Sequence, residues 1–483
     1  MDGVDPGYGF DDVTESSELC RVLLSRREEL ASASGCLAGL QMMRAYSDLT
    51  DALIRRIFRV AAEEAEADSP AAVRKDMRNL TVAAVGGYGR REMSPFSDVD
   101  VTFIVSEEAS DGVDLIVKKA FRILMDVLEA ARLKVGYSYR RVDDVENLPL
   151  DTQTALIDAR CITGSTALFG AFEARLREAI APAAFVIGHI EARSHPGRML
   201  STPYAVEPNI KAGRGGLRDL HAARWIAQVA YGLTGDRIWD GLRARGVVLD
   251  SDIRAVESAT EFIARTRNTL HLLAGRGLEV LSIERHDRLA VGMGFGTDDE
   301  PQAREFISTY YRHSQELWRI FHKVAEACLG RELEIEPGVV ARSGGLHILD
   351  KGLLARDGAA LIRLFQYAQS YKLQIHREAD DLIMASAQDY KLTLEASRSF
   401  VDILSGPGAP SALRAMAELG VLQAIVPRFG ELISLVPGDA AHQFTVGEHS
   451  LRAVESLDAL FADHDDQFID IFSRIQNLEV LFL

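Results

Sequence analysis

Cysteine and uninterrupted apolar runs are both scarce in this 483-residue chain. The four cysteines (Cys20, Cys36, Cys161 and Cys328) are scattered and form no Cys-x-x-Cys pair, which disfavours both a disulfide scaffold and a cysteine zinc site. No stretch approaches the 18 consecutive apolar residues of a membrane-spanning helix, and residues 1–5 lack the basic and apolar segments of a secretory signal. We therefore expect a cytoplasmic protein that does not enter a membrane.

Basic residues are also in deficit. Lys and Arg total 54 against 71 Asp and Glu, which gives a formal net charge of −17. This balance argues against a protein that binds nucleic acid through bulk positive charge, so no nucleic-acid partner is expected. The chain is too long for one compact core, and its 47% hydrophobic content is sufficient for the two to four domains that its length predicts.

The hydrophobic pattern changes along the chain from helical to strand-like and back to helical. Apolar residues at helical spacing predict helices over residues 16–67, and the short β-rich runs 80–85 and 99–105 predict two strands. A further helix is predicted at 115–132, with two more strands at 134–141 and 154–162, before mostly helical segments that include 252–275 and 303–330. The pattern indicates a mixed α/β domain between helical regions.

A glycine-rich turn follows the first predicted strand, in the segment Val85-Gly86-Gly87-Tyr88-Gly89-Arg90-Arg91. Glycines after a strand allow a sharp turn and let backbone N–H groups approach an anion without Cβ obstruction. Arg90 and Arg91 add positive charge beside them. A phosphate group is a suitable ligand for this turn.

Two aspartates begin the second predicted strand. Because side chains alternate along a strand, Asp98 and Asp100 point to the same face, roughly 6–7 Å apart at the backbone. Carboxylates placed in this way repel each other unless a cation neutralises them, and Mg²⁺ or Mn²⁺ commonly binds through a pair of carboxylates and substrate phosphates. Each motif alone is weak, since a glycine turn or an Asp-x-Asp pair is usually structural, but together they are specific.

The strand, the Gly-Gly turn and the spaced Asp-Val-Asp resemble the nucleotidyltransferase superfamily related to DNA polymerase β. The resemblance implies a small mixed sheet and a third carboxylate on a neighbouring strand. Asp158, within the apolar run 154–162, is the best candidate, and Asp151 is the competitor. Alternatively, Asp158 pairs with Arg160, or with an arginine of the preceding strand (Arg140 or Arg141). If it is catalytic, Asp98, Asp100 and Asp158 hold two metal ions.

A second glycine-rich cluster occupies residues 207–221, EPNIKAGRGGLRDLH. Lys211, Arg214 and Arg218 make it cationic, and it runs into a predicted helix whose first turn would accept an anion. The alternative is a basic surface loop whose glycines serve only a turn.

Taken together, GGYGRREMSPFSDVD, LIDARCITG and EPNIKAGRGGLRDLH resemble the bacterial PII uridylyltransferase/uridylyl-removing enzymes of nitrogen regulation. The resemblance implies that UTP donates UMP to a tyrosine of the trimeric signalling protein PII and that pyrophosphate is released. It also implies roles for individual residues, with Mg²⁺ on Asp98, Asp100 and Asp158 and the nucleotide on Gly86, Gly87, Arg90 and Ser97. Lys211, Arg214 and Arg218 become candidates for contacts with nucleotide phosphate or with the partner protein.

Members of that family continue into an HD-type phosphohydrolase domain, which removes UMP, and into two glutamine-sensing ACT domains. Residues 441–452 resemble the start of the HD domain, and His449 matches its first metal ligand, although Gly447 stands where the family pattern has an acidic residue. His442 and His464 are as well explained as solvated histidines. We expect a truncated chain with an incomplete metal site at His449, no uridylyl-removing activity and no glutamine control.

The predicted fold class is α/β plus α, a small polymerase-β-like mixed sheet followed by mostly helical domains. The expected division is an N-terminal helical arm (1–70), the nucleotidyltransferase core (71–170), a helical domain packed on it (171–335), a helical connector (336–440) and the start of an HD domain (441–483). Two rival functions stay open: a nucleotidyltransferase with another acceptor, and a non-catalytic regulator that binds nucleotide.

Overall fold

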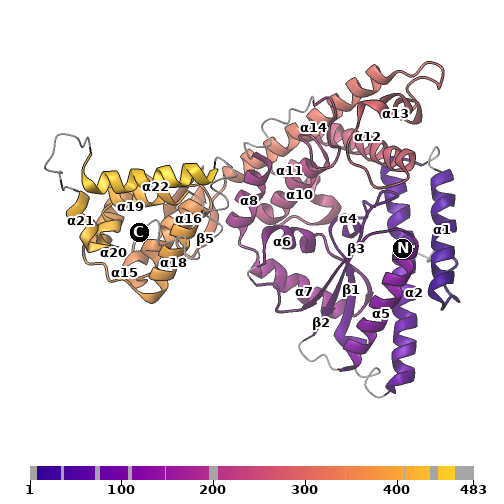
Figure 1. Cartoon of the computed structure of the whole chain (residues 1–483), viewed down its shortest axis with the longest axis horizontal. Helices are drawn as coiled ribbons and strands as arrows, with labels where there is room; N and C mark the ends of the chain where they lie inside the picture. The colour runs from indigo at the N-terminus through magenta and orange to yellow at the C-terminus, as the bar shows by residue number, and fades with distance from the viewer. Residues whose placement is uncertain are drawn as a thin grey trace. The chain divides into compact units, whose positions relative to one another are not determined.

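The structure is a computed structural model, and it describes residues 8–33, 37–70, 77–106, 111–146, 148–194, 205–342, 344–406, 408–433, 435 and 444–462. The chain divides into two compact units (Figure 1). The first unit comprises residues 1–181 and 189–326, and the second comprises residues 182–188 and 327–483.

A four-stranded mixed sheet is the centre of the first unit. Its strands are β1 (Leu80–Ala84), β2 (Val99–Val105), β3 (Val135–Arg141) and β4 (Arg160–Gly164), in the order β3-β2-β1-β4. β1 runs antiparallel to both β2 and β4, whereas β2 and β3 are parallel. The predicted strands at 80–85, 99–105 and 134–141 are thereby confirmed.

Described helices precede, connect and follow these strands along the chain, from residue 16 to residue 329. They are α1 (Ser16–Ser32), α2 (Gly39–Asp68), α4 (Gly86–Gly89), α5 (Asp111–Ala130), α6 (Leu150–Ile157), α7 (Thr166–Ala179), α8 (Pro182–Ser194), α10 (Leu217–Tyr231), α11 (Ile238–Ala244), α12 (Asp250–Ala274), α13 (His286–Gly292) and α14 (Ala303–Leu329), with short 3-10 turns η1 (Met77–Asn79), η2 (Gly235–Arg237) and η3 (Ile283–Arg285). The helices predicted at 115–132, 252–275 and 303–330 correspond to α5, α12 and α14.

One face of the sheet packs against α2 and α5 (Figure 1). The alternate β2 residues Val99, Val101, Phe103 and Val105 all belong to the resulting core cluster, which also contains residues of α1. The predicted helices within 16–67 are confirmed as α1 and α2. They share this core with the sheet, whereas the sequence had suggested a separate helical arm.

The predicted strand at 154–162 is wrong in its first half. Residues 150–157 form α6, and the strand β4 begins only at Arg160. A short apolar run is compatible with either a buried strand or a helix. Here Pro149 is the N-cap of α6, so the chain enters a helix before it reaches the sheet.

The second unit has its own four-stranded sheet. The sequence had predicted a helical connector at 336–440 and no sheet. The strand order of the observed sheet is β5-β6-β7-β8, with β5 at Leu333–Glu336, β6 at Val339–Arg342, β7 at Gly345–Ile348 and β8 at Gln374–Ile375. Its helices are α15 (Leu353–Arg356), α16 (Ala360–Ser370), α17 (Asp380–Gln388), α18 (Leu394–Ser405), α19 (Ala409–Glu418), α20 (Val421–Ile425), α21 (Pro427–Ile433) and α22 (Val446–Ala462), with the 3-10 turn η4 (Arg377–Ala379).

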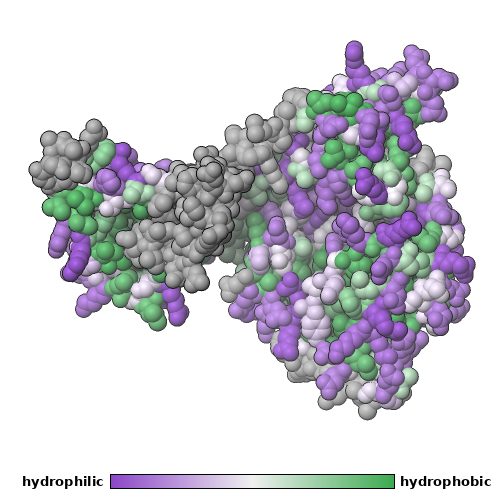
Figure 2. Space-filling view, in the orientation of Figure 1, coloured by the Kyte–Doolittle hydropathy of each residue, from purple (hydrophilic) through white to green (hydrophobic). Residues whose placement is uncertain are grey.

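Hydrophilic side chains are interspersed with apolar ones over the face of the first unit shown in Figure 2. Among the described residues, none of the helices combines the length and the hydropathy that crossing a membrane requires.

Candidate active site

Asp100 lies on β2, on the face of the sheet opposite the helical core. Its backbone partner on the parallel strand β3 is Gly136. A Cβ atom at Gly136 would lie only 2.1 Å from Asp100 Oδ1, so the carboxylate occupies the space that a side chain on β3 would fill. The absence of a side chain at Gly136 is therefore what allows Asp100 to lie across the neighbouring strand.

The glycine turn faces the same carboxylate. The Val85 N–H donates to the Asp100 carbonyl at 3.1 Å, which fixes the end of β1 against the start of β2. Gly86 has a φ of +56°, a left-handed conformation that favours glycine, and a Cβ atom there would lie 4.0 Å from Asp100 Oδ2. The predicted turn is the start of the four-residue helix α4, and it leaves open space beside Asp100.

Asp98, Asp100 and Lys211 form the electrostatic centre of the site. Burial and, after it, the nearby charge of Asp98 raise the pKa of Asp100, while Lys211 acts in the opposite direction. Burial also lowers the pKa of Lys211, and Arg267 adds to that shift, whereas Glu279 and Asp98 oppose it. The structure thus brings a lysine from the second glycine-rich cluster to the aspartate pair of the first.

The loop that leads into the aspartates is held from within and from a distant helix. The Ser94 N–H donates to Ser97 Oγ at 2.9 Å, and the Ser94 hydroxyl donates to Asn268 Oδ1 on α12 at 2.8 Å. The Phe96 N–H donates to His271 Nδ1, also on α12, at 3.4 Å. Ser97, which was predicted to bind nucleotide, supports the turn that positions Asp98.

Helix α1 holds the same loop. Arg27 donates a hydrogen bond to the carbonyl of Pro95, and its guanidinium lies over the Phe96 ring, 5.3 Å from the ring centroid. Neither α1 nor α12 was connected to the aspartates in the sequence analysis, because no local pattern indicates a contact between such distant segments.

Asp158 is not on a strand. It is the C-cap residue of α6, and its Oδ2 accepts hydrogen bonds from Arg90 Nη1 at 2.6 Å and from Trp225 Nε1 at 2.7 Å. The expectation of a third carboxylate on a neighbouring strand is wrong, because β1, β3 and β4 contain no acidic residue. Asp158 does pair with an arginine, but with Arg90 rather than with those considered from the sequence.

Arg90 forms ion pairs with two carboxylates in a buried polar network. Besides Asp158, it contacts Glu92 Oε2 at 2.8 Å, and Glu92 also lies 2.7 Å from His221 Nε2. Burial opposes the charge of Arg90, but the carboxylates of Glu92 and Asp158 more than offset burial and raise the pKa of the guanidinium. Arg90 is therefore engaged by two protein carboxylates beside the glycine turn, although the sequence suggested that it binds phosphate.

The expected anion site at the start of α10 is not present in this structure. The Leu217 and Arg218 N–H groups donate to the carbonyls of Ile210 and Lys211 at 2.9 and 2.8 Å. The Gly215 N–H donates to the Asp219 carboxylate at 2.6 Å. The first-turn N–H groups thus bind the loop's own oxygens, and the glycines serve close packing.

The three basic residues of that loop have different surroundings. Lys211 lies near Asp98 and Asp100, whereas the Arg214 guanidinium lies 3.8 Å from the centroid of the Trp318 ring. Arg218 lies over Trp225, 5.5 Å from its centroid. Of the three, Lys211 is the one whose charge is shown to act on Asp100.

His449 is exposed near the start of α22. Among the described residues it joins no group of three side chains able to hold a metal. His442 and His464 lie outside the described residues, so the predicted HD-type site is represented here by His449 alone.

Two family descriptions match the chain, and together they cover most of the first unit. Residues 32–140, which contain the glycine turn and the aspartate pair, match a putative nucleotidyltransferase family, DUF294. Residues 184–325 match the GlnD PII-uridylyltransferase family. The site and these matches place the chain in the nucleotidyltransferase class.

Similarity to curated proteins extends over most of the chain. Bifunctional uridylyltransferase/uridylyl-removing enzymes from Ruegeria pomeroyi and Cereibacter sphaeroides are 32% and 30% identical over 87% and 90% of this chain. One from Caulobacter vibrioides is 27% identical over 92%. Over most of its own length the chain is similar to this bacterial PII uridylyltransferase/uridylyl-removing enzyme family. It spans about half the length of these relatives, 48% to 50%.

Proposed function

We propose that the first unit transfers UMP from UTP to a tyrosine hydroxyl of PII and releases pyrophosphate. In this reaction the tyrosine oxygen bonds to the α-phosphorus, and the bond from that phosphorus to the oxygen bridging the β-phosphate breaks. Pyrophosphate leaves with that oxygen, and the hydroxyl proton passes to solvent. The observation that carries the proposal is the pair Asp98 and Asp100 beside a side-chain-free turn at Gly86 and Gly87.

The residues present fit a divalent cation. Burial and Asp98 destabilise the ionised form of Asp100 and so raise its pKa. A cation bound beside the carboxylate would stabilise that ionised form. Asp100 Oδ1 lies in the space that a side chain at Gly136 would fill, so Gly136 permits this position of the carboxylate. Asp98 and Asp100 would hold Mg²⁺ or Mn²⁺, which supplies charge neutralisation for the triphosphate and activation of the attacking hydroxyl.

Lys211 is proposed to contact the nucleotide phosphates, because it is the cation that lies near both aspartates. We assign Arg90 and Asp158 a supporting role, since their ion pair holds the end of α4 against α6 and so fixes the glycine turn. A direct role of Asp158 as metal ligand is the alternative drawn from the family resemblance, and the two roles predict different variant behaviour. Arg214 and Arg218 remain candidates for contacts with the partner protein.

The test is to incubate the full chain with PII, Mg²⁺ and each labelled nucleoside triphosphate in turn. We expect transfer of label to PII from UTP only, and a decrease of about 100-fold or more in Asp100→Asn, as for loss of one preorganised electrostatic stabiliser. Release of pyrophosphate without labelled PII would favour another acceptor. Binding of UTP without pyrophosphate release would favour a non-catalytic regulator.

Removal of UMP from PII is a separate activity, and we propose that this chain lacks it. Hydrolysis in an HD-type site requires a set of metal ligands, to which the described part of the chain contributes His449 alone. Metal-dependent release of UMP from labelled PII-UMP by this chain would refute the proposal.

A further inference from the structure

A second group of metal-binding side chains lies in the second unit, at the end of its small sheet. Strands β7 and β8 are parallel, and their last registered pair is Leu346 with Ile375. The His376 N–H donates to the Leu346 carbonyl at 2.9 Å, so the register places His347 and His376 side by side. Glu378 follows in the 3-10 turn η4, where the Ala379 N–H bonds the His376 carbonyl at 2.9 Å.

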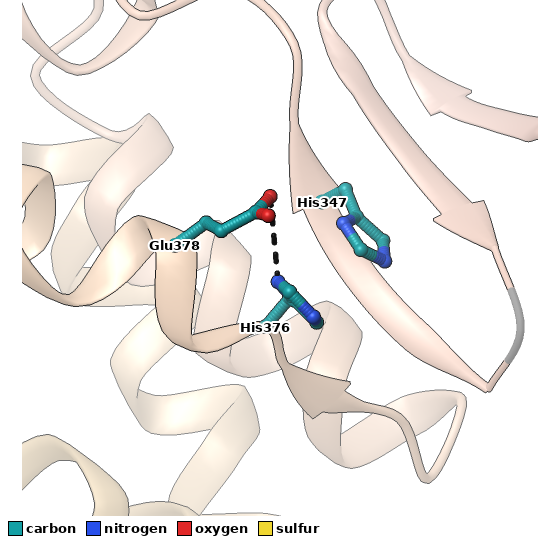
Figure 3. A group of neighbouring side chains, drawn as sticks. All are labelled: His347, His376 and Glu378. Atoms are coloured by element: carbon teal, nitrogen blue, oxygen red, sulfur yellow. Dashed lines mark ion pairs between the residues drawn. The ribbon is translucent and has the colours of Figure 1, made fainter.

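The three side chains converge (Figure 3). The imidazole rings of His347 and His376 are stacked, with centroids 4.3 Å apart and planes inclined by 26°. His376 Nδ1 lies 3.5 Å from Glu378 Oε2. One donor atom from each residue can be chosen such that all three lie within 4.8 Å of one another.

We propose that His347, His376 and Glu378 bind one divalent transition-metal ion, for which Zn²⁺ is the best match. Two imidazoles and one carboxylate are a donor set that zinc accepts, and they leave a fourth position for water or another ligand. Mg²⁺ and Ca²⁺ prefer oxygen ligands throughout, so this site differs in chemistry from the aspartate pair. The inference does not depend on the proposed transferase activity.

Binding requires only side-chain movement. Donor atoms around tetrahedral zinc lie about 3.3 Å apart, given metal–ligand distances near 2 Å, so the present spread must contract by roughly 1.5 Å. The His376 and Glu378 side chains are 46% and 77% exposed and are free to rotate, whereas His347 is 8% exposed and held in β7. The backbone thus supplies one fixed ligand and two adjustable ones.

One charge opposes the ion. Arg342 Nη2 lies 3.5 Å from His347 Nδ1, and its Nη1 lies 3.5 Å from Glu332. The Arg342 side chain is 44% exposed, so it can turn towards solvent when a cation enters. Replacement of this arginine by a neutral residue should therefore strengthen metal binding.

The test is a Zn²⁺ titration of the full chain in excess Mg²⁺, which saturates oxygen-only sites, with Co²⁺ absorption as a second readout of nitrogen ligation. We expect one zinc ion to bind, and His376→Ala and Glu378→Gln to weaken binding at least about tenfold, since even loss of an outer partner costs that much. Arg342→Gln should tighten binding by about fivefold, as expected for a partly solvated charge.

Asp381→Asn is the matched control, because it removes an exposed carboxylate of the same unit, in the first turn of α17, that lies outside this group. It should leave zinc affinity and the cobalt spectrum unchanged. Far-UV circular dichroism of each variant checks that the fold is retained. If His376→Ala and Glu378→Gln bind zinc as tightly as the unaltered chain, the proposal is wrong.

Discussion

Replacement of Asp158 by asparagine separates the two roles considered for this residue. Its side chain and that of Arg90 are 7% and 9% exposed, and the pair is 2.6 Å apart. Removal of one partner from a buried ion pair costs about 3–5 kcal/mol, because the other charge stays buried. Arg90 keeps Glu92 at 2.8 Å, and asparagine still offers one acceptor oxygen. Burial also raises the pKa of Asp158 against the opposing effect of Arg90, so the neutral side chain recovers part of this cost. We therefore expect a loss near the lower limit, about 3 kcal/mol.

Urea unfolding followed by tryptophan fluorescence measures this loss within the first unit alone, because the three tryptophans, Trp225, Trp239 and Trp318, all belong to it. With a urea dependence of about 3 kcal/mol per molar, the midpoint should fall by about 1 M. Asp151→Asn is the control. Asp151 is exposed in the first turn of α6, where a charge contributes about 1 kcal/mol or less.

Magnesium dependence supplies the second readout. If Asp158 supports the glycine turn through Arg90, Asp158→Asn lowers the rate at saturating Mg²⁺ and leaves the Mg²⁺ concentration for half-maximal rate nearly unchanged. If Asp158 binds the metal, that concentration rises strongly while stability is retained. Unchanged stability together with a raised Mg²⁺ requirement would refute our assignment.

Three further perturbations address the aspartate pair itself. Gly136→Ala places a Cβ atom 2.1 Å from Asp100 Oδ1 and should raise the Mg²⁺ requirement of transfer. Gly170→Ala should not, because an added Cβ atom there meets no atom outside its own helix segment within 4 Å. Equal Mg²⁺ curves for the two variants would contradict the placement of Asp100. Lys211→Gln should raise the KM for UTP about tenfold, as expected for loss of one charged hydrogen bond to phosphate, and an unchanged KM would remove Lys211 from the nucleotide site. The raised pKa of Asp100 means that its protonated carboxyl group favours folding below the unfolded pKa and that this contribution is lost as pH rises through the folded pKa. Asp100→Asn should therefore be slightly more stable than the unaltered chain at neutral pH, measured by urea unfolding without metal. A less stable variant would contradict a raised pKa caused by burial and by Asp98.

The strands beside the aspartates were predictable because their signal is local. Strands β1 and β2 are short runs of β-branched and apolar residues, and this local pattern places Asp100 in β2 and Asp98 directly before it. Gly136 was overlooked, although a glycine inside a predicted strand indicates a close approach by another group. Trp225 had no such local signal.

Asp158 illustrates what local reasoning misses. The run TALIDARCI is apolar enough for a strand, and an acid within it seemed to require a catalytic explanation. The structure places the acid at the end of a helix and pairs it with Arg90, which lies far away in the sequence. No spacing rule reveals a partner that only tertiary packing supplies. The same limit applies to Lys211, whose approach to the aspartates depends on the path of the loop before α10.

The small sheet of the second unit was missed for a different reason. Its strands contain four residues or fewer, which is at or below the lower limit of the windows in which alternation can be recognised. The pairing of β7 with β8 also joins segments separated by the intervening helix α16, so the proximity of His347 and His376 appears only in the folded chain.

The contacts of α1 and α12 with the segment from Ser94 to Phe96 limit how the first unit can be shortened or transferred to another protein. Arg27, Asn268 and His271 come from opposite ends of the first unit, so a fragment that begins at β1 would retain the glycine turn and both aspartates but lose their scaffold. Transfer of the strand-turn-strand motif alone into another protein would carry over Asp98 and Asp100 without the contacts that hold the preceding loop in place.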